Sequence, residues 1–156
     1  MQLLPERYSL RSLPAVSFST LMELYESNYI RFRRLAPSLD RLSGSVTLSA
    51  RGEPDLHLTI LDRARFTTTV MLAHQSSEDD GELGERHELH LRVYHDARLA
   101  EALPCPMNAT EEEPVCELVE RWKRNRFLYK WLAYNLSCGY RLGDTAKSRP
   151  ILNSLP

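Results

Sequence analysis

Four residues that lie close together in the sequence combine a base, an acid and a guanidinium: Tyr94, His95, Asp96 and Arg98. A histidine beside an aspartate can act as a general base, and a nearby arginine can hold a phosphate or carboxylate through two parallel hydrogen bonds. This set is the candidate ligand-binding site. The alternative is a hairpin turn in which Asp96 accepts backbone amide hydrogens, because adjacent strand residues point to opposite sheet faces. We favour the turn and assign no catalytic residue.

Histidine and cysteine form no recognisable metal-binding motif, although the chain has 5 histidines and 3 cysteines. His57 and His90 occupy polar positions of two predicted strands, and on neighbouring strands two imidazoles can bind zinc. No HExxH spacing accompanies them. Cys105, Cys116 and Cys138 form no CxxC pair and are expected to be reduced, structural thiols. We predict no metal and no cofactor.

A predicted helix near the C-terminus carries more aromatic side chains than one helix face can bury. Trp122, Phe127, Trp131 and Tyr134 are spread widely around this helix, so Trp131 and Tyr134 are expected on a second surface. An exposed aromatic rim is typical of a protein interface. The alternative is that the ends of the chain cover these rings. The leading hypothesis is therefore an interaction surface for a protein partner or a second copy of the chain.

Two basic clusters, Arg31–Arg34 and Arg121–Arg126, each contain an aromatic residue, as phosphate-binding surfaces can. Acidic residues at 111–120 precede the second cluster, and ion pairs with them would neutralise its charge. The formal net charge of the whole chain is −1, which gives no general attraction to nucleic acid. We therefore interpret the two clusters as solvent-exposed helix faces and keep RNA binding as an alternative.

The first helix is predicted from about Thr20 to Ala36. Thr20 and Glu23 have the spacing of a capping box, in which each side chain satisfies a free backbone amide at the helix start. Apolar residues then recur at intervals of three and four, as they do on one face of a helix. Pro37 disfavours helical geometry at Ala36 and so ends the helix.

The middle of the chain changes to the alternating pattern of strands. The predicted strands cover residues 45–49, 55–60, 66–72, 87–94 and 98–103. Their short connections indicate an antiparallel meander of four to five strands. A second helix is predicted from Val115 to a left-handed cap at Gly139. The residues predicted on its buried stripe are Val115, Leu118, Val119, Trp122, Tyr129, Leu132 and Leu136. The fold class is α+β: an N-terminal helix, the meander, and a C-terminal helix, with both helices packed on one sheet face.

The length of 156 residues fits one domain, which we place at residues 17–139, between an irregular leader (1–16) and an irregular tail (140–156). A hydrophobic content of 42% and a charged content of 26% are ordinary for a globular protein. No apolar run is long enough for a transmembrane helix. The N-terminus has no basic region followed by an apolar core, so we predict no secretory signal and a cytoplasmic location.

Several motifs occur together and in order along the chain. They are Arg65-Phe-Thr-Thr68, Arg92-Val-Tyr-His-Asp-Ala97 with Glu101, and a helix pattern with Asn125, Trp131 and Gly139. This combination resembles the YqiB-like family of small bacterial proteins, whose function is not established. The resemblance supplies no catalytic residues. Relatives carry an additional strand-like piece before the last helix, where this chain has the short acidic stretch 104–113.

The sequence therefore predicts a non-catalytic binding protein. Protein interaction through the aromatic residues of the last helix is the first hypothesis. A small-ligand or nucleotide-handling protein, with a pocket near Tyr94, His95 and Arg98 and basic residues from either helix, is the second.

Overall fold

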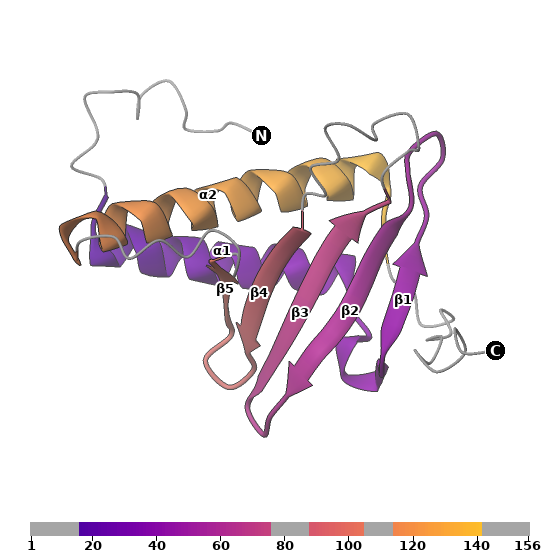
Figure 1. Cartoon of the computed structure of the whole chain (residues 1–156), viewed down its shortest axis with the longest axis horizontal. Helices are drawn as coiled ribbons and strands as arrows, with labels where there is room; N and C mark the ends of the chain where they lie inside the picture. Colours follow the sequence, from indigo (N-terminus) through magenta and orange to yellow (C-terminus); the bar gives the residue numbers. More distant parts are fainter. Residues whose placement is uncertain (1–15, 76–87, 105–113, 142–156) are drawn as a thin grey trace.

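The computed structural model describes residues 16–75, 88–104 and 114–141, which form a helix, five strands and a second long helix in that order (Figure 1). The helices are α1 (Phe18–Leu35), a short 3-10 helix η3 (Leu39–Arg41) and α2 (Pro114–Cys138). The strands are β1 (Ser45–Leu48), β2 (Leu56–Arg63), β3 (Thr67–His74), β4 (Glu88–Tyr94) and β5 (Leu99–Leu103). The predicted α+β class is confirmed. Predictions for residues 1–15, 76–87, 105–113 and 142–156 fall outside the described residues.

The five strands form one antiparallel meander in the order β1-β2-β3-β4-β5, as predicted. The register places apolar residues of neighbouring strands directly opposite one another. One such row contains Val46, Leu58 and Leu72, and another contains Val70, Leu91 and Ala102. All six of these side chains are buried. Because side chains alternate between the faces of a strand, this register gives the sheet one apolar face.

Helix α1 begins earlier than predicted. Its N-cap is Ser17, whose side chain accepts from the amide of Thr20 while the Thr20 hydroxyl accepts from the amide of Ser17. The predicted cap formed by Thr20 and Glu23 is therefore wrong, because Ser17 offers the same hydroxyl one turn earlier. The predicted end is confirmed: α1 stops at Leu35, and Ala36 leaves helical geometry before Pro37.

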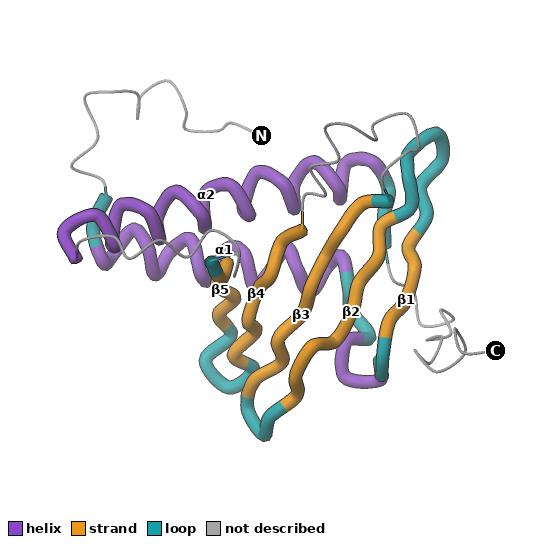
Figure 2. Tube along the Cα trace, in the orientation of Figure 1, coloured by secondary structure: helices purple, strands orange, loops and turns teal. Residues whose placement is uncertain are grey.

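Both long helices lie on the apolar face of the sheet and run parallel to each other (Figure 1). The parallel direction follows from two contacts, Asn28 with Asn125 and Arg31 with Tyr129, in which both residue numbers increase together. The opposite face of the sheet is covered by no described helix (Figure 2). The core therefore lies between the sheet and one helical layer, as the sequence predicted.

A buried asparagine on α2 joins three elements. The side-chain oxygen of Asn125 accepts the backbone amide of Ala102 on β5 at 2.8 Å, and its amide group donates to the carbonyl of Arg121. From α1, the side chain of Asn28 donates to the carbonyl oxygen of Asn125 at 3.2 Å. Both asparagines are fully buried. Since β5 is an edge strand, Asn125 satisfies an edge amide that would otherwise be buried without a partner.

The buried stripe of α2 agrees with the predicted one at Leu132 and differs from it elsewhere. It consists of Asn125, Leu128, Leu132 and Asn135, whereas Leu118 and Val119 are exposed, each at 38%. The prediction counted only apolar residues, and two of the four inward positions are asparagines. Within the described residues, no helix has both the length and the apolar character needed to cross a membrane.

Candidate functional site

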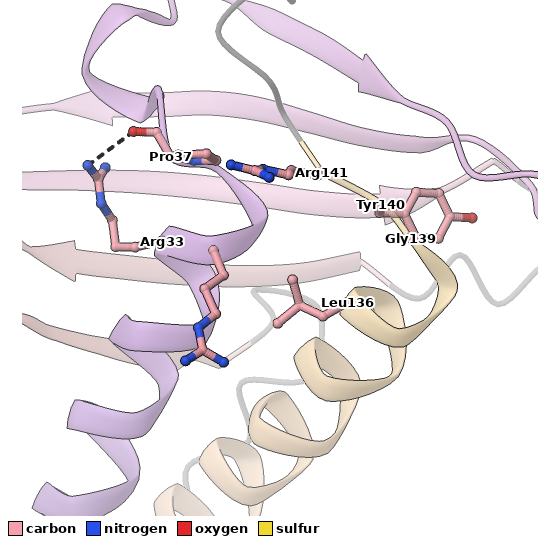
Figure 3. A pocket seen from close by; sticks show the side chains of 7 residues that line it. Arg33, Pro37, Leu136, Gly139, Tyr140 and Arg141 are labelled. Atoms are coloured by element: carbon pink, nitrogen blue, oxygen red, sulfur yellow. Dashed lines mark hydrogen bonds between the residues drawn. The ribbon is translucent and has the colours of Figure 1, made fainter.

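A groove of about 530 Å³ opens where α1 and α2 end side by side (Figure 3). Ligand pockets in proteins have volumes of roughly 300–1,000 Å³, so the groove is large enough for a small molecule. Its lining combines three arginines with a few apolar groups: Arg33, Arg34, Pro37, Leu136, Gly139, Tyr140 and Arg141. This composition favours a ligand that is negatively charged.

The end of α1 positions two of the arginines. Pro37 turns the chain away after Leu35, and Arg33 donates to the carbonyl oxygen of Pro37 at 3.2 Å. The second terminal nitrogen of Arg33, Nη1, is buried and has no hydrogen-bond partner within the described residues. Arg34 is exposed at the groove. The end of α1 thus contributes one anchored guanidinium with an unused donor and one that is free to move.

The end of α2 positions the third arginine. Gly139 adopts a left-handed conformation with φ of 99°, and the amides of Gly139 and Tyr140 bond back to Leu136 and Asn135. These two bonds define a Schellman motif, as the predicted glycine cap requires. Tyr140 is 1% exposed, and its hydroxyl donates to the carbonyl oxygen of Pro54. Arg141 is therefore held at the groove by the buried residue before it.

The electrostatic balance of the groove is positive. The C-termini of two helices each carry about −0.5 charge, which disfavours anions. Asp40 adds another negative charge, 4.0 Å from Arg33. Against these stand the full positive charges of Arg33, Arg34 and Arg141, which leaves a net charge of about +1. Within the described residues, neither Arg34 nor Arg141 forms an ion pair with a carboxylate.

The residues predicted as a ligand site around Tyr94 do not converge. Tyr94 donates its hydroxyl to Glu101 at 2.5 Å, and burial together with this bond raises the pKa of Tyr94. The His95 ring is 2.7 Å from the hydroxyl of Thr68, while Asp96 is exposed in the β4–β5 turn. The favoured interpretation, a structural hairpin turn, agrees with these contacts.

Arg98 completes that turn in a left-handed conformation. Its φ is 57°, and among the described residues other than glycine it alone has a positive φ. Its side chain is exposed. Such a conformation is uncommon outside glycine and occurs mostly in turns. None of Tyr94, His95, Asp96 and Arg98 lines the groove at the helix ends. The second hypothesis placed basic residues of the helices in a pocket near Tyr94. The structure has such residues at the ends of both helices, in a groove that does not include Tyr94.

The aromatic residues of α2 divide into two groups. Trp131 packs against the core and lies 5.2 Å, between ring centroids, from His74 on β3. Trp122 is partly buried, with the guanidinium of Arg126 over its ring. Phe127 and Tyr134 are 49% and 56% exposed. The expectation that Trp131 lies on a second surface is wrong, because its phase on α2 directs it toward the end of β3.

The two histidines considered for zinc are separated by a strand. His57 on β2 pairs with Ala73 of β3, and His90 on β4 pairs with Met71 of the same strand. The alternative in which His57 and His90 bind zinc from neighbouring strands is therefore wrong, because β3 lies between them. Cys138, at the end of α2, is a free thiol. No group of three or more potential metal ligands occurs within the described residues.

Sequence reasoning named Arg33 and Arg34 as part of a basic cluster but missed Arg141, which it placed in an irregular tail. Two helix-ending residues, Pro37 and Gly139, were recognised. Both residues line the groove, so the sequence predicted where each helix ends but not that the two ends lie together. The relative direction of the helices was not visible in the sequence.

The family assignment follows from comparison with known proteins. Residues 31–141 match the model of a family described as "Protein of unknown function (DUF1249)". The chain belongs to this family. All seven residues that line the groove lie within the matched range.

The chain is also similar to curated relatives. It is 29% identical over 129 residues to "Uncharacterized protein YqiB" of Escherichia coli strain K12, which covers 78% of this chain and 90% of the relative. The YqiB proteins of Escherichia coli O6:H1 and O157:H7 match with the same identity and coverage. No solved structure matches the chain. The resemblance predicted from the sequence motifs is therefore confirmed.

Proposed function

We propose that this protein binds a small molecule carrying a phosphate or carboxylate group in the groove between the ends of α1 and α2. The observation that carries the proposal is that Arg33, Arg34 and Arg141 all line one groove. Arginine presents several donors in a planar fork that matches both kinds of anion.

The groove also offers an apolar contact. The side chain of Leu136 reaches from α2 toward the last turn of α1, and Pro37 lines the groove after the end of α1 (Figure 3). An anionic group on the arginines would leave the rest of the ligand against these two residues. This arrangement agrees with the usual composition of ligand sites, in which a few polar groups orient a ligand on an apolar wall.

The proposal is tested by calorimetric titration with inorganic phosphate and pyrophosphate at constant ionic strength. We expect binding that weakens about tenfold in Arg34→Gln and in Arg141→Gln, which corresponds to the loss of one charge-assisted hydrogen bond of about 1.4 kcal/mol. Arg121→Gln is the matched control, because it removes the same charge from a residue already bonded to Glu117 at 2.6 Å. Absence of binding to wild type, or equal weakening in all three variants, would contradict the proposal.

A second candidate function is docking of a second copy of the chain on the exposed side of α2. The observation that favours it is the pair Phe127 and Tyr134, both about half exposed and about two helical turns apart. Sedimentation at increasing concentration would show self-association in wild type and its loss in Phe127→Ala/Tyr134→Ala. Phe66→Ala is the control, because Phe66 is 52% exposed on the β2–β3 turn. A monomer at every concentration would remove this candidate.

A further inference from the structure

The two long helices separate their charges along their length. Acidic residues lie toward their N-terminal ends, where α1 carries Glu23 and Glu26 and α2 carries Glu117 and Glu120. From residue 27 to 39 the chain has three arginines and no acidic residue, and from 121 to 141 it has six lysines or arginines and no acidic residue. Because the helices are parallel and Arg31 contacts Tyr129, the arginines of the last turns of α1 lie level with the part of α2 from Tyr129 onward, where Lys130 and Arg141 follow. The formal net charge of −1 conceals this local excess.

Some of these cations are already engaged with other groups. Arg121 and Lys123 form ion pairs with Glu117 and Glu120 at 2.6 and 3.7 Å. Arg31 donates to the carbonyl oxygen of Tyr129 at 2.8 Å and lies over its ring. Arg33 lies 4.0 Å from Asp40, Arg126 lies over the ring of Trp122, and Arg124 is partly buried. We call Arg126, Lys130, Arg34, Arg33 and Arg141, which lie at the helix junction and the groove, the basic track.

The contact between Arg31 and Tyr129 locates the track at the junction of the two helices. Residues three or four apart are neighbours on a helix surface. Arg34 follows Arg31 by three residues on α1, Arg126 precedes Tyr129 by three on α2, and Lys130 follows Arg126 by four. Arg34 and Lys130 are exposed, and Arg126 is partly exposed. The track therefore runs along the solvent side of the helix junction and ends in the groove.

The dimensions of the track distinguish an extended polyanion from a single phosphate. With a rise of 1.5 Å per residue, Arg126 lies about 18 Å along the axis of α2 from Cys138, where the helix ends at the groove. Arg126 and Lys130 are about 6 Å apart along the axis of α2.

We infer that the basic track binds the phosphate backbone of single-stranded RNA, with one phosphate in the groove and further phosphates along the helix junction. This inference rests on the proposed function, since it uses the same groove. The five residues of the track come from α1, from α2 and from the residues directly after α2, so a single strand that follows the junction of the two helices can contact them. The rings of Trp122 and Tyr129 are covered by Arg126 and Arg31, so recognition is by phosphate and independent of base sequence.

The test measures binding of a uridine hexanucleotide, inorganic phosphate and linear polyphosphate to the full chain at 50 and 200 mM salt. Each phosphate contacted in a single strand contributes a slope of about −0.7 in log affinity against log salt, so four contacts predict a slope near −3 and a weakening of about fiftyfold. Arg126→Gln/Lys130→Gln should weaken hexanucleotide binding at least tenfold and make the slope shallower by about 1.4. Binding of inorganic phosphate should stay unchanged in that variant.

Arg121→Gln/Lys123→Gln is the matched control, since it removes the same charge from the same helix at residues that are already paired. Equal weakening in the control and the track variant would overturn the inference. Hexanucleotide binding no tighter than that of phosphate would overturn it while leaving the proposed function standing, and absence of binding to any of the three would overturn both. Polyphosphate that binds as tightly as the hexanucleotide would overturn the assignment to RNA.

Discussion

Replacement of Asn125 by alanine is expected to destabilise the protein more than its size suggests. The substitution leaves the backbone amide of Ala102 buried without its 2.8 Å acceptor, which costs about 1–3 kcal/mol. It also removes the 3.5 Å contact between the side chains of Asn125 and Asn28, while the bond of Asn28 to the backbone carbonyl remains, and it leaves a small cavity at a fully buried position, which adds roughly 1 kcal/mol. We expect a total loss of about 3 kcal/mol in the free energy of unfolding.

Asn135→Ala provides the matched control. Asn135 is fully buried on the same helix and also donates to the carbonyl four residues earlier, at Trp131. Its oxygen, however, meets the ring of His74 instead of a backbone amide. A partly exposed imidazole can bond to water, so we expect a loss of only about 1 kcal/mol.

The assay is equilibrium unfolding in urea, followed by tryptophan fluorescence and circular dichroism. Asn28→Ala should also cost about 1 kcal/mol or less, because the oxygen of Asn28 is already buried without a partner within the described residues. If Asn125→Ala lost no more stability than Asn135→Ala, the amide at the edge of β5 would not be the reason for a buried asparagine at this position.

Three further predictions concern single residues. Trp131→Ala should lower the free energy of unfolding by about 3 kcal/mol, because Trp131 packs on the core, whereas Tyr134→Ala should change it by less than about 0.5 kcal/mol in the same urea assay; equal losses would contradict the two positions. Burial, reinforced by the negative charge of Glu101, raises the pKa of Tyr25 to about 12. The resulting stability is complete below the unfolded pKa near 10 and is lost as pH rises through 12, so wild type should lose up to about 3 kcal/mol more than Tyr25→Phe between pH 9.5 and 12 in urea unfolding; parallel pH profiles would refute this. Gly139→Ala meets no steric obstacle but forces an L side chain into a left-handed conformation, which should cost about 1–2 kcal/mol by thermal unfolding; an unchanged midpoint would show that the Schellman motif is not required.

The strands and the ends of the helices followed from local chemistry. Alternating residues in β4 and β5, Pro37 after α1 and Gly139 after α2 each act within a few positions of the sequence, so their effects could be predicted. Thr20 was misassigned as the cap because Ser17 competes for the same role three residues earlier.

The features that could not be predicted depend on contacts between distant residues. Asn125 is buried because it bonds to an edge strand, a partner that hydrophobic patterning does not represent. Trp131 lies against His74 because α2 crosses the end of β3, and the sequence alone does not fix that crossing. Arg141 belongs to the groove only because Tyr140 is anchored beside Pro54, 86 positions away.

The sequence grouped Arg33 and Arg34 in a basic cluster, but it did not place them beside the end of α2. A pocket with basic residues from the helices was expected, and its arginines come from both helix ends. The pocket was assigned to the neighbourhood of Tyr94, because the sequence places a base, an acid and a cation there. Tyr94 ends β4 and Asp96 and Arg98 lie in the turn that follows it, whereas the parallel direction of α1 and α2 places the arginines of the groove around Leu136.

The most direct test of the central proposal is a titration of the isotope-labelled protein with inorganic phosphate, observed through the side-chain Nε–Hε resonances of arginine by nuclear magnetic resonance. We predict saturable shifts for Arg33, Arg34 and Arg141, with Arg98 and Arg121 unchanged. Shifts of similar size at all arginines would indicate general screening of charge, and shifts centred on Arg98 would return the site to the β4–β5 turn. Either result would contradict binding in the groove.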